Sequence, residues 1–218
     1  MNFPSGFFDR SDPETDRAFY ASPRFVTHID DRAIAAVAAL YEELGVPEGD
    51  VLDLMSSWVS HLPRRPKSLC ALGMNVQELA ANPMATSALQ HDLNERQQLP
   101  LPDASFDSVL CCVSVDYLTA PLEVFSETLR VLRPGGLFVC TFSNRLFPTK
   151  AIRGWLYASD LERVGIVEEY FRRSGPWDGP MSRTCLRPDG LGDPLYAVWA
   201  RRPGPDLVDP ASVPSRRG

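Results

Sequence analysis

The chain has 218 residues, a hydrophobic content of 44% and a formal net charge of −6, which suits one globular domain with a single sizeable core. The acidic balance argues against a general nucleic-acid binder, because such a protein needs a basic face. No apolar run approaches the roughly 20 residues of a membrane span. Charged residues at positions 9–14 interrupt any signal-peptide core, so a cytoplasmic protein with no membrane or nucleic-acid partner is expected.

Residues 1–29 are rich in phenylalanine and proline and show no clear periodicity. We expect them to form an N-terminal arm or lid that packs on the rest of the chain. A helix is predicted from about Asp31, where an acidic residue suits a helix start. Gly45 and Pro47 are expected to end this helix. Its apolar stripe consists of Ile34, Val37, Ala38, Tyr41 and Leu44.

The next segments predict three short strands, over residues 51–54, 68–72 and 88–91. A helix over residues 76–81 is predicted between the last two. The loop over residues 99–105 contains two prolines and leads into a fourth strand.

Residues 109–141 contain a buried strand, an amphipathic helix and a second buried strand. The turn Pro134-Gly135-Gly136 is expected to end the helix, because proline cannot continue it and glycine tolerates left-handed backbone. This order predicts a β-α-β unit of a doubly wound sheet. The apolar stripe of the helix consists of Leu122, Phe125, Leu129 and Leu132.

Four of the five cysteines fall inside predicted strands. They are interpreted as small buried hydrophobes in a reducing compartment. Adjacent Cys111 and Cys112 point to opposite faces of a strand, so no metal site is expected.

In the C-terminal part, Ser159 and Glu162 form a capping-box pattern that predicts a helix start. The helix is expected to run to Gly175. Two further strands, over residues 181–187 and 195–202, predict a closing antiparallel hairpin.

The predicted fold class is α/β. A single domain over residues 30–202 is expected to contain one doubly wound, Rossmann-like sheet of seven mostly parallel strands with a C-terminal antiparallel hairpin. The arm over residues 1–29 precedes it. Residues 203–218 contain several prolines and charges and are expected to be a disordered tail.

A family resemblance is found in the second half of this predicted domain. Residues 106–109, Phe-Asp-Ser-Val, are followed by Arg-Val-Leu-Arg-Pro-Gly-Gly at residues 130–136. This pairing resembles class I S-adenosylmethionine-dependent methyltransferases, type 11 in particular. The similarity runs from about residue 51 to 141, and more loosely to about 202. The resemblance implies S-adenosyl-L-methionine as cofactor; it indicates the fold and the cofactor more directly than the reaction.

Open α/β sheets bind ligands at the loops that leave the carboxyl ends of their strands. Here those loops begin at Met55, Gly73, Asp92, Ser114 and Ser143. The resemblance implies that the first of them contacts the methionine part of the cofactor.

The first loop departs from the family. Asp53 is kept, but none of the usual glycines follows it in Met55-Ser56-Ser57-Trp58-Val59. Ser56 and Ser57 are small donors that suit a carboxylate, so Asp53, Ser56 and Ser57 are interpreted as cofactor contacts. A purely structural loop is the alternative, and Trp58 either walls the site or fills the core.

In the second loop, Asn75 follows the position where the family has an acidic residue for the ribose hydroxyls. Asn75 or Glu78 is a candidate substitute, since either accepts a hydrogen bond; alternatively both residues only begin a helix. In the third loop, the resemblance implies that Asp92 and the backbone of Leu93 contact adenine. The alternative for Asp92 is a turn residue that caps its own backbone. Ser114 completes the expected cofactor set.

The methyl acceptor is expected to face the fourth loop, where Asp116 is a candidate base and Tyr117 an aromatic wall. Alternatively, Asp116 caps the turn before Pro121. After the fifth strand, Asn144, Arg145 and Lys150 are candidates for binding an anionic acceptor group, or else ordinary surface residues.

Tyr20, Arg24 and His28 lie in the arm, which in this fold often covers the acceptor pocket; of these, Tyr20 and His28 are candidate acceptor contacts. His28 is a possible general base, because the pKa of a free imidazole lies near neutrality. A structural histidine is the alternative interpretation.

The preferred hypothesis is methyl transfer from S-adenosylmethionine to an unidentified small molecule. Methyl transfer needs mainly alignment and exclusion of water, so the lack of an obvious catalytic dyad is compatible with activity. The alternative is a catalytically degenerate methyltransferase fold kept for binding or assembly, which a cavity filled by Met55 and Trp58 would favour. A nicotinamide dehydrogenase is disfavoured, because no Gly-x-Gly-x-x-Gly follows the first strand.

Overall fold

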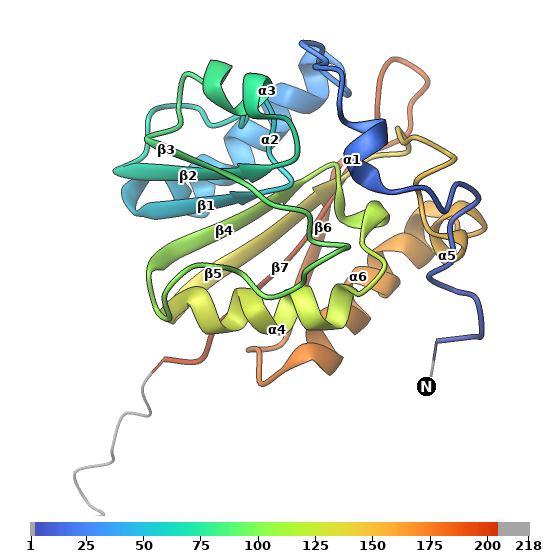
Figure 1. The fold of residues 1–218 in the computed structure, drawn as a ribbon. Coiled ribbons are helices and arrows are strands. Elements are labelled where there is room, and N and C mark those ends of the chain that lie inside the picture. The colour runs from blue at the N-terminus through green and yellow to red at the C-terminus, as the bar shows by residue number, and fades with distance from the viewer. Residues whose placement is uncertain (1–2, 205–218) are drawn as a thin grey trace, which may run out of the picture.

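A twisted central sheet with helices on both faces dominates the computed structural model, which describes residues 3–204 (Figure 1). In this part of the chain the sheet has seven strands in the order β3-β2-β1-β4-β5-β7-β6. Strands β1 to β5 are parallel to their neighbours, whereas β7 runs antiparallel to β5 and β6 antiparallel to β7. The predicted fold class is therefore confirmed. The strands are β1 Asp50–Leu54, β2 Ser68–Gly73, β3 Ser87–Gln90, β4 Phe106–Cys112, β5 Leu132–Phe142, β6 Met181–Leu186 and β7 Leu195–Arg201.

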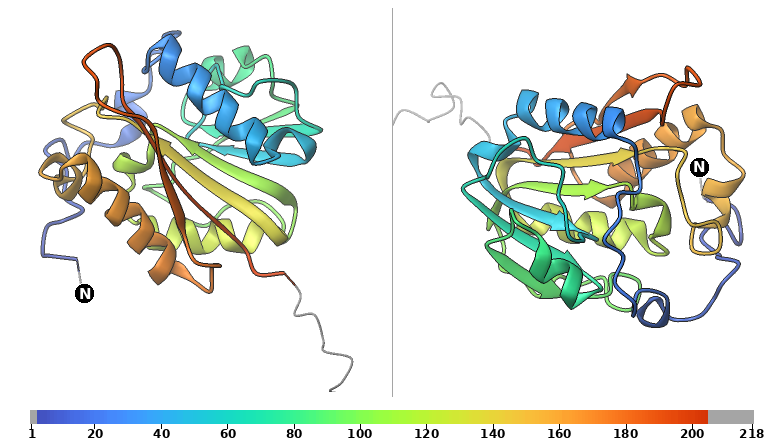
Figure 2. Two further views of the ribbon diagram at one scale, coloured as in Figure 1. Left: turned by 180° about the vertical axis from the view of Figure 1, so that it is seen from behind. Right: turned by 90° about the horizontal axis from the view of Figure 1, so that it is seen from above.

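Two helical layers cover the sheet (Figure 2). Helices α2 (Asp31–Glu43) and α3 (Val76–Ala81) bury their apolar residues on one face, and α4 (Pro121–Val131) and α6 (Asp160–Ser174) on the other. Strand residues alternate between the two cores, as the pleat requires. In β5, for example, Phe138 packs with the α4 and α6 side and Val139 with the α2 side. Shorter helices are α1 (Asp16–Phe19), η1 (Val46–Glu48), η2 (Val115–Tyr117) and α5 (Arg153–Leu156).

The predicted element positions agree closely with this structure. Helix α3 has the predicted bounds, and the capping box is formed: the Ser159 hydroxyl accepts from the Glu162 amide while the Glu162 carboxylate accepts from the Ser159 amide. Strand β3 begins and ends one residue earlier than predicted.

The prediction that Pro134-Gly135-Gly136 ends the preceding helix is wrong. Helix α4 already ends at Val131, and the backbone continues directly into β5. The Pro-Gly-Gly stretch lies where the β4–β5 register shifts, and Gly135 has φ +79°. The glycine is therefore needed for an irregularity inside the strand and not for the helix end.

The topology explains where a site forms. Strand β1 lies between β2 and β4, so the chain winds outward from β1 in both directions, and the loops that follow β1 and β4 diverge at their carboxyl ends. This switch point is where doubly wound sheets leave a crevice for a ligand.

The N-terminal arm, residues 3–29, runs over this carboxyl edge and includes α1 (Figure 1). Its first part packs on α5 and α6: the Gly154 amide donates to the Phe7 carbonyl, and the Phe3 ring lies 5.7 Å from that of Tyr170. Of the predicted tail, all but residues 203 and 204 lies outside the described residues. No helix within residues 3–204 is long and apolar enough to cross a membrane.

Candidate functional site

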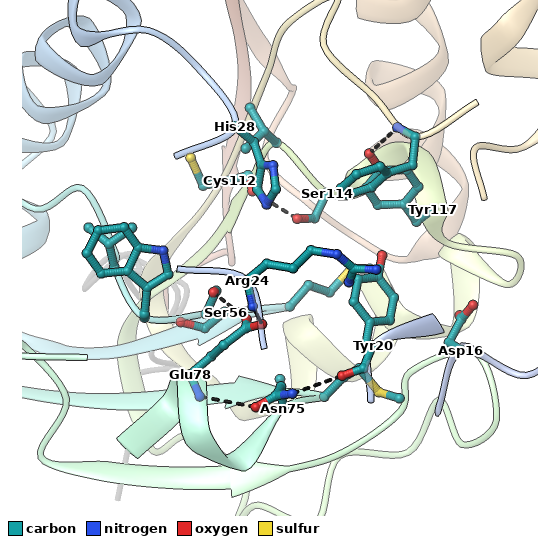
Figure 3. A pocket seen from close by; sticks show the side chains of 18 of the residues that line it. Asp16, Tyr20, Arg24, His28, Ser56, Asn75, Glu78, Cys112, Ser114 and Tyr117 are labelled. Atoms are coloured by element: carbon teal, nitrogen blue, oxygen red, sulfur yellow. Dashed lines mark hydrogen bonds between the residues drawn. The ribbon is translucent and has the colours of Figure 1, made fainter. Parts of the chain in front are cut away.

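A cavity of about 580 Å³ lies at the switch point, between the carboxyl ends of the parallel strands and the arm (Figure 3). Its volume falls within the roughly 300–1,000 Å³ of ligand and cofactor pockets. Of the residues predicted to form the site, Asp116 and Lys150 lie outside the lining. Those that line the cavity are Tyr20, His28, Asp53, Ser56, Ser57, Asn75, Glu78, Asp92, Leu93, Ser114, Tyr117, Asn144 and Arg145.

The loop after β1 keeps a sharp turn without glycine. Met55 has φ +53°, a left-handed conformation that costs an L-residue roughly 1–2 kcal/mol. The Ser56 amide then donates to the Leu72 carbonyl at 2.7 Å, which holds the loop across the end of β2. A Cβ atom at Gly73 would overlap the Ser56 carbonyl oxygen. Gly73 thus lets the first loop lie directly against the end of β2.

The buried Asp53 carboxylate holds this loop in place through hydrogen bonds. Asp53 is 3% exposed, and its carboxylate accepts from the hydroxyls of Ser56 (2.7 Å) and Ser60 (2.6 Å). Burial raises the pKa of Asp53 to about 6, and the two hydroxyl hydrogen bonds oppose that rise. Asp53 therefore acts by fixing the loop that borders the cavity.

Asn75 and Glu78 have different roles at the start of α3. The Asn75 side chain is fully used, since its Oδ1 accepts from two α3 amides and its Nδ2 donates to the carbonyls of Tyr20 and Ala21. The buried Glu78 carboxylate accepts from the Ser57 hydroxyl at 2.5 Å and from the Arg24 amide at 2.6 Å. Each of its oxygens has further acceptor capacity. Glu78 is thus better suited than Asn75 to bind ribose hydroxyls.

The loop after β3 presents Asp92 to the cavity. Its Oδ1 accepts from the amides of Asn94 and Glu95, the turn-capping role considered as the alternative. Neither hydrogen bond uses Oδ2. The capped turn therefore orients the carboxylate and leaves acceptor capacity for a ligand.

The structure does not support Asp116 as a base that faces the acceptor. Residues Val115–Tyr117 form a short 3-10 helix, and this turn directs Ser114 and Tyr117 to the cavity and Asp116 into the interior. Asp116 is 2% exposed, and its Oδ2 has no hydrogen-bond partner among the described residues. Burial raises the pKa of Asp116 to about 7.

Tyr117 lines the cavity together with Asn144 and other residues of the loop that follows β5. The Tyr117 hydroxyl accepts from the Phe147 amide at 2.9 Å, and burial raises the pKa of this phenol. Arg145 is largely exposed and lies 3.7 Å from Asp193. Lys150, also considered for anion binding, is fully buried and forms ion pairs with Asp12 (2.9 Å) and Asp16 (3.4 Å), so its ammonium is committed to holding the arm.

His28 and His61 both border the cavity. Burial, together with the positive charge of Arg24, lowers the pKa of His28 below its ordinary value, so the imidazole is neutral at neutral pH and can accept a proton. Burial lowers the pKa of His61 to about 4, with a smaller contribution from His28. His61 also has φ +51°, a second strained position beside the site.

Sequence analysis left Glu78 as one of two candidates for the ribose acceptor and did not assign Arg24 or His61 to the site. Glu78 could have been preferred because it is the first acidic residue after β2. Arg24 and His61 have no local pattern to mark them, since their place depends on contacts with distant segments.

Comparisons with known proteins agree with this geometry. Residues 43–140 match the family model described as a methyltransferase domain. A malonyl-[acyl-carrier protein] O-methyltransferase of Marinomonas sp. is 27% identical over 125 residues, which cover 56% of this chain and 44% of that protein. The chain spans less than half the length of the curated relatives it matches.

Two solved structures share the fold. A 1,6-didemethyltoxoflavin-N1-methyltransferase of Burkholderia thailandensis, with bound 1,6-didemethyltoxoflavin and S-adenosylhomocysteine, has a TM-score of 0.59 at 18% identity, over 80% of each chain. The [4+2]-cyclase SpnF has a TM-score of 0.57 at 15% identity, over 87% of this chain and 92% of its own. The fold therefore does not by itself determine the reaction.

Proposed function

Because residues 43–140 match the methyltransferase domain family, we propose that the chain transfers the methyl group of S-adenosylmethionine to a small-molecule acceptor. The observation that carries the proposal is the open cavity at the switch point. Met55 and Trp58 border this cavity and do not fill it. A cavity filled by these two side chains would indicate a catalytically degenerate fold. Since the cavity is open, the binding or assembly alternative is disfavoured.

The residues around the cavity fit the cofactor. Glu78 and Asp92 are acceptors for ribose and adenine groups, and Ser56 and Ser57 border the first loop, where the methionine part is expected. When bound, S-adenosylmethionine supplies an activated methyl group on a sulfonium, so the protein needs little acid–base chemistry. The Burkholderia thailandensis methyltransferase that shares the fold holds S-adenosylhomocysteine, the demethylated form of this cofactor.

The protein then contributes alignment and exclusion of water. The arm covers the cavity and is fixed there by hydrogen bonds from Asn75 to the Tyr20 carbonyl and from the Trp58 indole to the Val26 carbonyl. Neutral His28 is positioned to take a proton from an acceptor that carries one. A net charge of −6 favours a small molecule over nucleic acid as the acceptor.

Calorimetric titration with S-adenosylmethionine and S-adenosylhomocysteine tests the proposal. We expect micromolar binding, weakened by about 1.5–3 kcal/mol in Asp92→Ala, the cost of losing a hydrogen bond to a charged group. Glu78→Gln should also weaken the binding of S-adenosylmethionine and S-adenosylhomocysteine. Glu95→Ala, an exposed change in the same loop, should bind like the wild type. No binding at millimolar concentration would refute the proposed function.

A further inference from the structure

The guanidinium group of Arg24 borders the cavity with one nitrogen unpartnered. Its Nη2 donates to the Phe19 carbonyl at 2.8 Å, whereas Nη1 is buried and has no hydrogen-bond partner among the described residues. Arginine stays charged in proteins, and a buried cationic donor without an acceptor is costly. Because other atoms of Arg24 line the cavity, a ligand bound there is the candidate for the acceptor that the buried Nη1 lacks.

Among the described residues, no carboxylate pairs with this charge. Within residues 3–204, Arg24 forms no ion pair at 4.0 Å or less. The nearby Asp16 is occupied by Arg10 and Lys150, and Glu78 by the Ser57 hydroxyl and the Arg24 backbone amide. The positive charge of Arg24 also contributes to lowering the pKa of His28. The wall around Arg24 is therefore suited to a negatively charged group.

Aromatic rings surround the guanidinium group. Its central carbon lies 4.5 Å from the ring centroid of Phe19 and 5.6 Å from those of Tyr20 and Phe147. Phe147 in turn lies 5.3 Å from the ring of His28 and 6.0 Å from that of Tyr117. Such rings form flat apolar walls that suit another ring, and they hold the guanidinium in a fixed plane.

We propose that Arg24 binds the carboxylate of a flat, ring-containing acid, which makes an aromatic acid the class of methyl acceptor. This inference rests on the proposed function. Figure 3 shows the Arg24 side chain crossing the cavity toward Tyr20, between Ser56 and Asn75 on one side and Ser114 and Tyr117 on the other. Its ring contacts lie in the arm and the loop after β5, the two segments whose residues are expected to face the acceptor. The charge–ring arrangement thus belongs to the acceptor side.

The test uses benzoate as the probe and benzamide as its neutral counterpart, each titrated into the full chain with and without saturating S-adenosylhomocysteine. We expect benzoate to bind at least about tenfold more tightly than benzamide, the effect of one charge-assisted hydrogen bond. Arg24→Gln should abolish this preference and keep the affinity for S-adenosylhomocysteine. Arg17→Gln, an exposed change in the same arm, should retain both.

Arg24→Lys provides a second variant that keeps the charge but loses the planar fork, and it should retain only part of the preference. Equal binding of benzoate and benzamide to the wild type, or an unchanged preference in Arg24→Gln, would overturn the inference. So would loss of S-adenosylhomocysteine binding in Arg24→Gln with the benzoate preference intact. If the wild type fails to bind S-adenosylhomocysteine, the proposed function fails, while the titrations without it still test Arg24.

Discussion

The buried carboxyl group of Asp116 makes the stability of the protein depend on pH in a defined direction. Its Oδ2 has no partner among the described residues, and burial raises its pKa to about 7 from the ordinary 3.8, against smaller opposing effects of a hydrogen bond with its own backbone and of Arg163. The unfolded chain releases this proton near pH 4, whereas the folded chain keeps it until about pH 7. The folded state therefore loses stability as the pH rises through this interval.

The size of the effect follows from the shift. About three pKa units at 1.36 kcal/mol each give roughly 4 kcal/mol lost between pH 4 and pH 8. Asp116→Asn removes the titration and retains the shape of the side chain. The measured quantity is the unfolding free energy of the variant minus that of the wild type. This difference should be larger at pH 8 than at pH 4 by up to that amount.

Urea unfolding of both proteins at intervals from pH 4 to 8 measures this difference. Subtracting the two curves cancels the other carboxyl groups, including Asp53 and the ion-paired Asp50, whose pKa is lowered to about 2 chiefly by its hydrogen bond with Lys67. Glu123→Gln, an exposed change on α4, serves as the control and should show no such trend. A difference between Asp116→Asn and the wild type that does not vary with pH would refute the reasoning.

Two further predictions concern the close approach of the β1 and β2 loops and the attachment of the arm. Gly73→Ala forces a Cβ onto the Ser56 carbonyl, so it should cost about 1–3 kcal/mol of stability and weaken S-adenosylhomocysteine binding measured by calorimetry. Gly165→Ala, in open space on α6, is the control and should be neutral or stabilising. Lys150→Met removes a fully buried ammonium that pairs with Asp12 and Asp16, so it should destabilise the protein more than the exposed change Lys67→Met, which should cost less than about 1 kcal/mol. It should also speed proteolysis of the arm. Equal losses in these two lysine variants would contradict the assigned role.

The sequence predicted the sheet well because the central strands β1, β2, β4 and β5 contain short apolar runs, and it placed the site because the carboxyl ends of parallel strands meet at one edge. What it missed depends on orientation or on distant contacts. The Asp116 side chain points into the interior, and not to the cavity, because of one 3-10 turn. No periodicity in the sequence predicts this turn. Arg24 reaches the cavity because its amide binds Glu78, 54 residues further along the chain. The Pro-Gly-Gly turn was misplaced because a glycine needed inside a strand resembles one that ends a helix.

The first loop shows how such a site can persist without the expected glycines. Met55 adopts the left-handed backbone that glycine would adopt freely, and the hydrogen bond from Ser56 to Leu72 helps to hold that conformation. Asp53 further fixes the loop through the Ser56 and Ser60 hydroxyls. The remaining steric requirement moves to Gly73, where any side chain would strike the loop. The absence of glycines after β1 is therefore not sufficient to infer loss of the cofactor site, because the loop still turns sharply at Met55 and borders an open cavity.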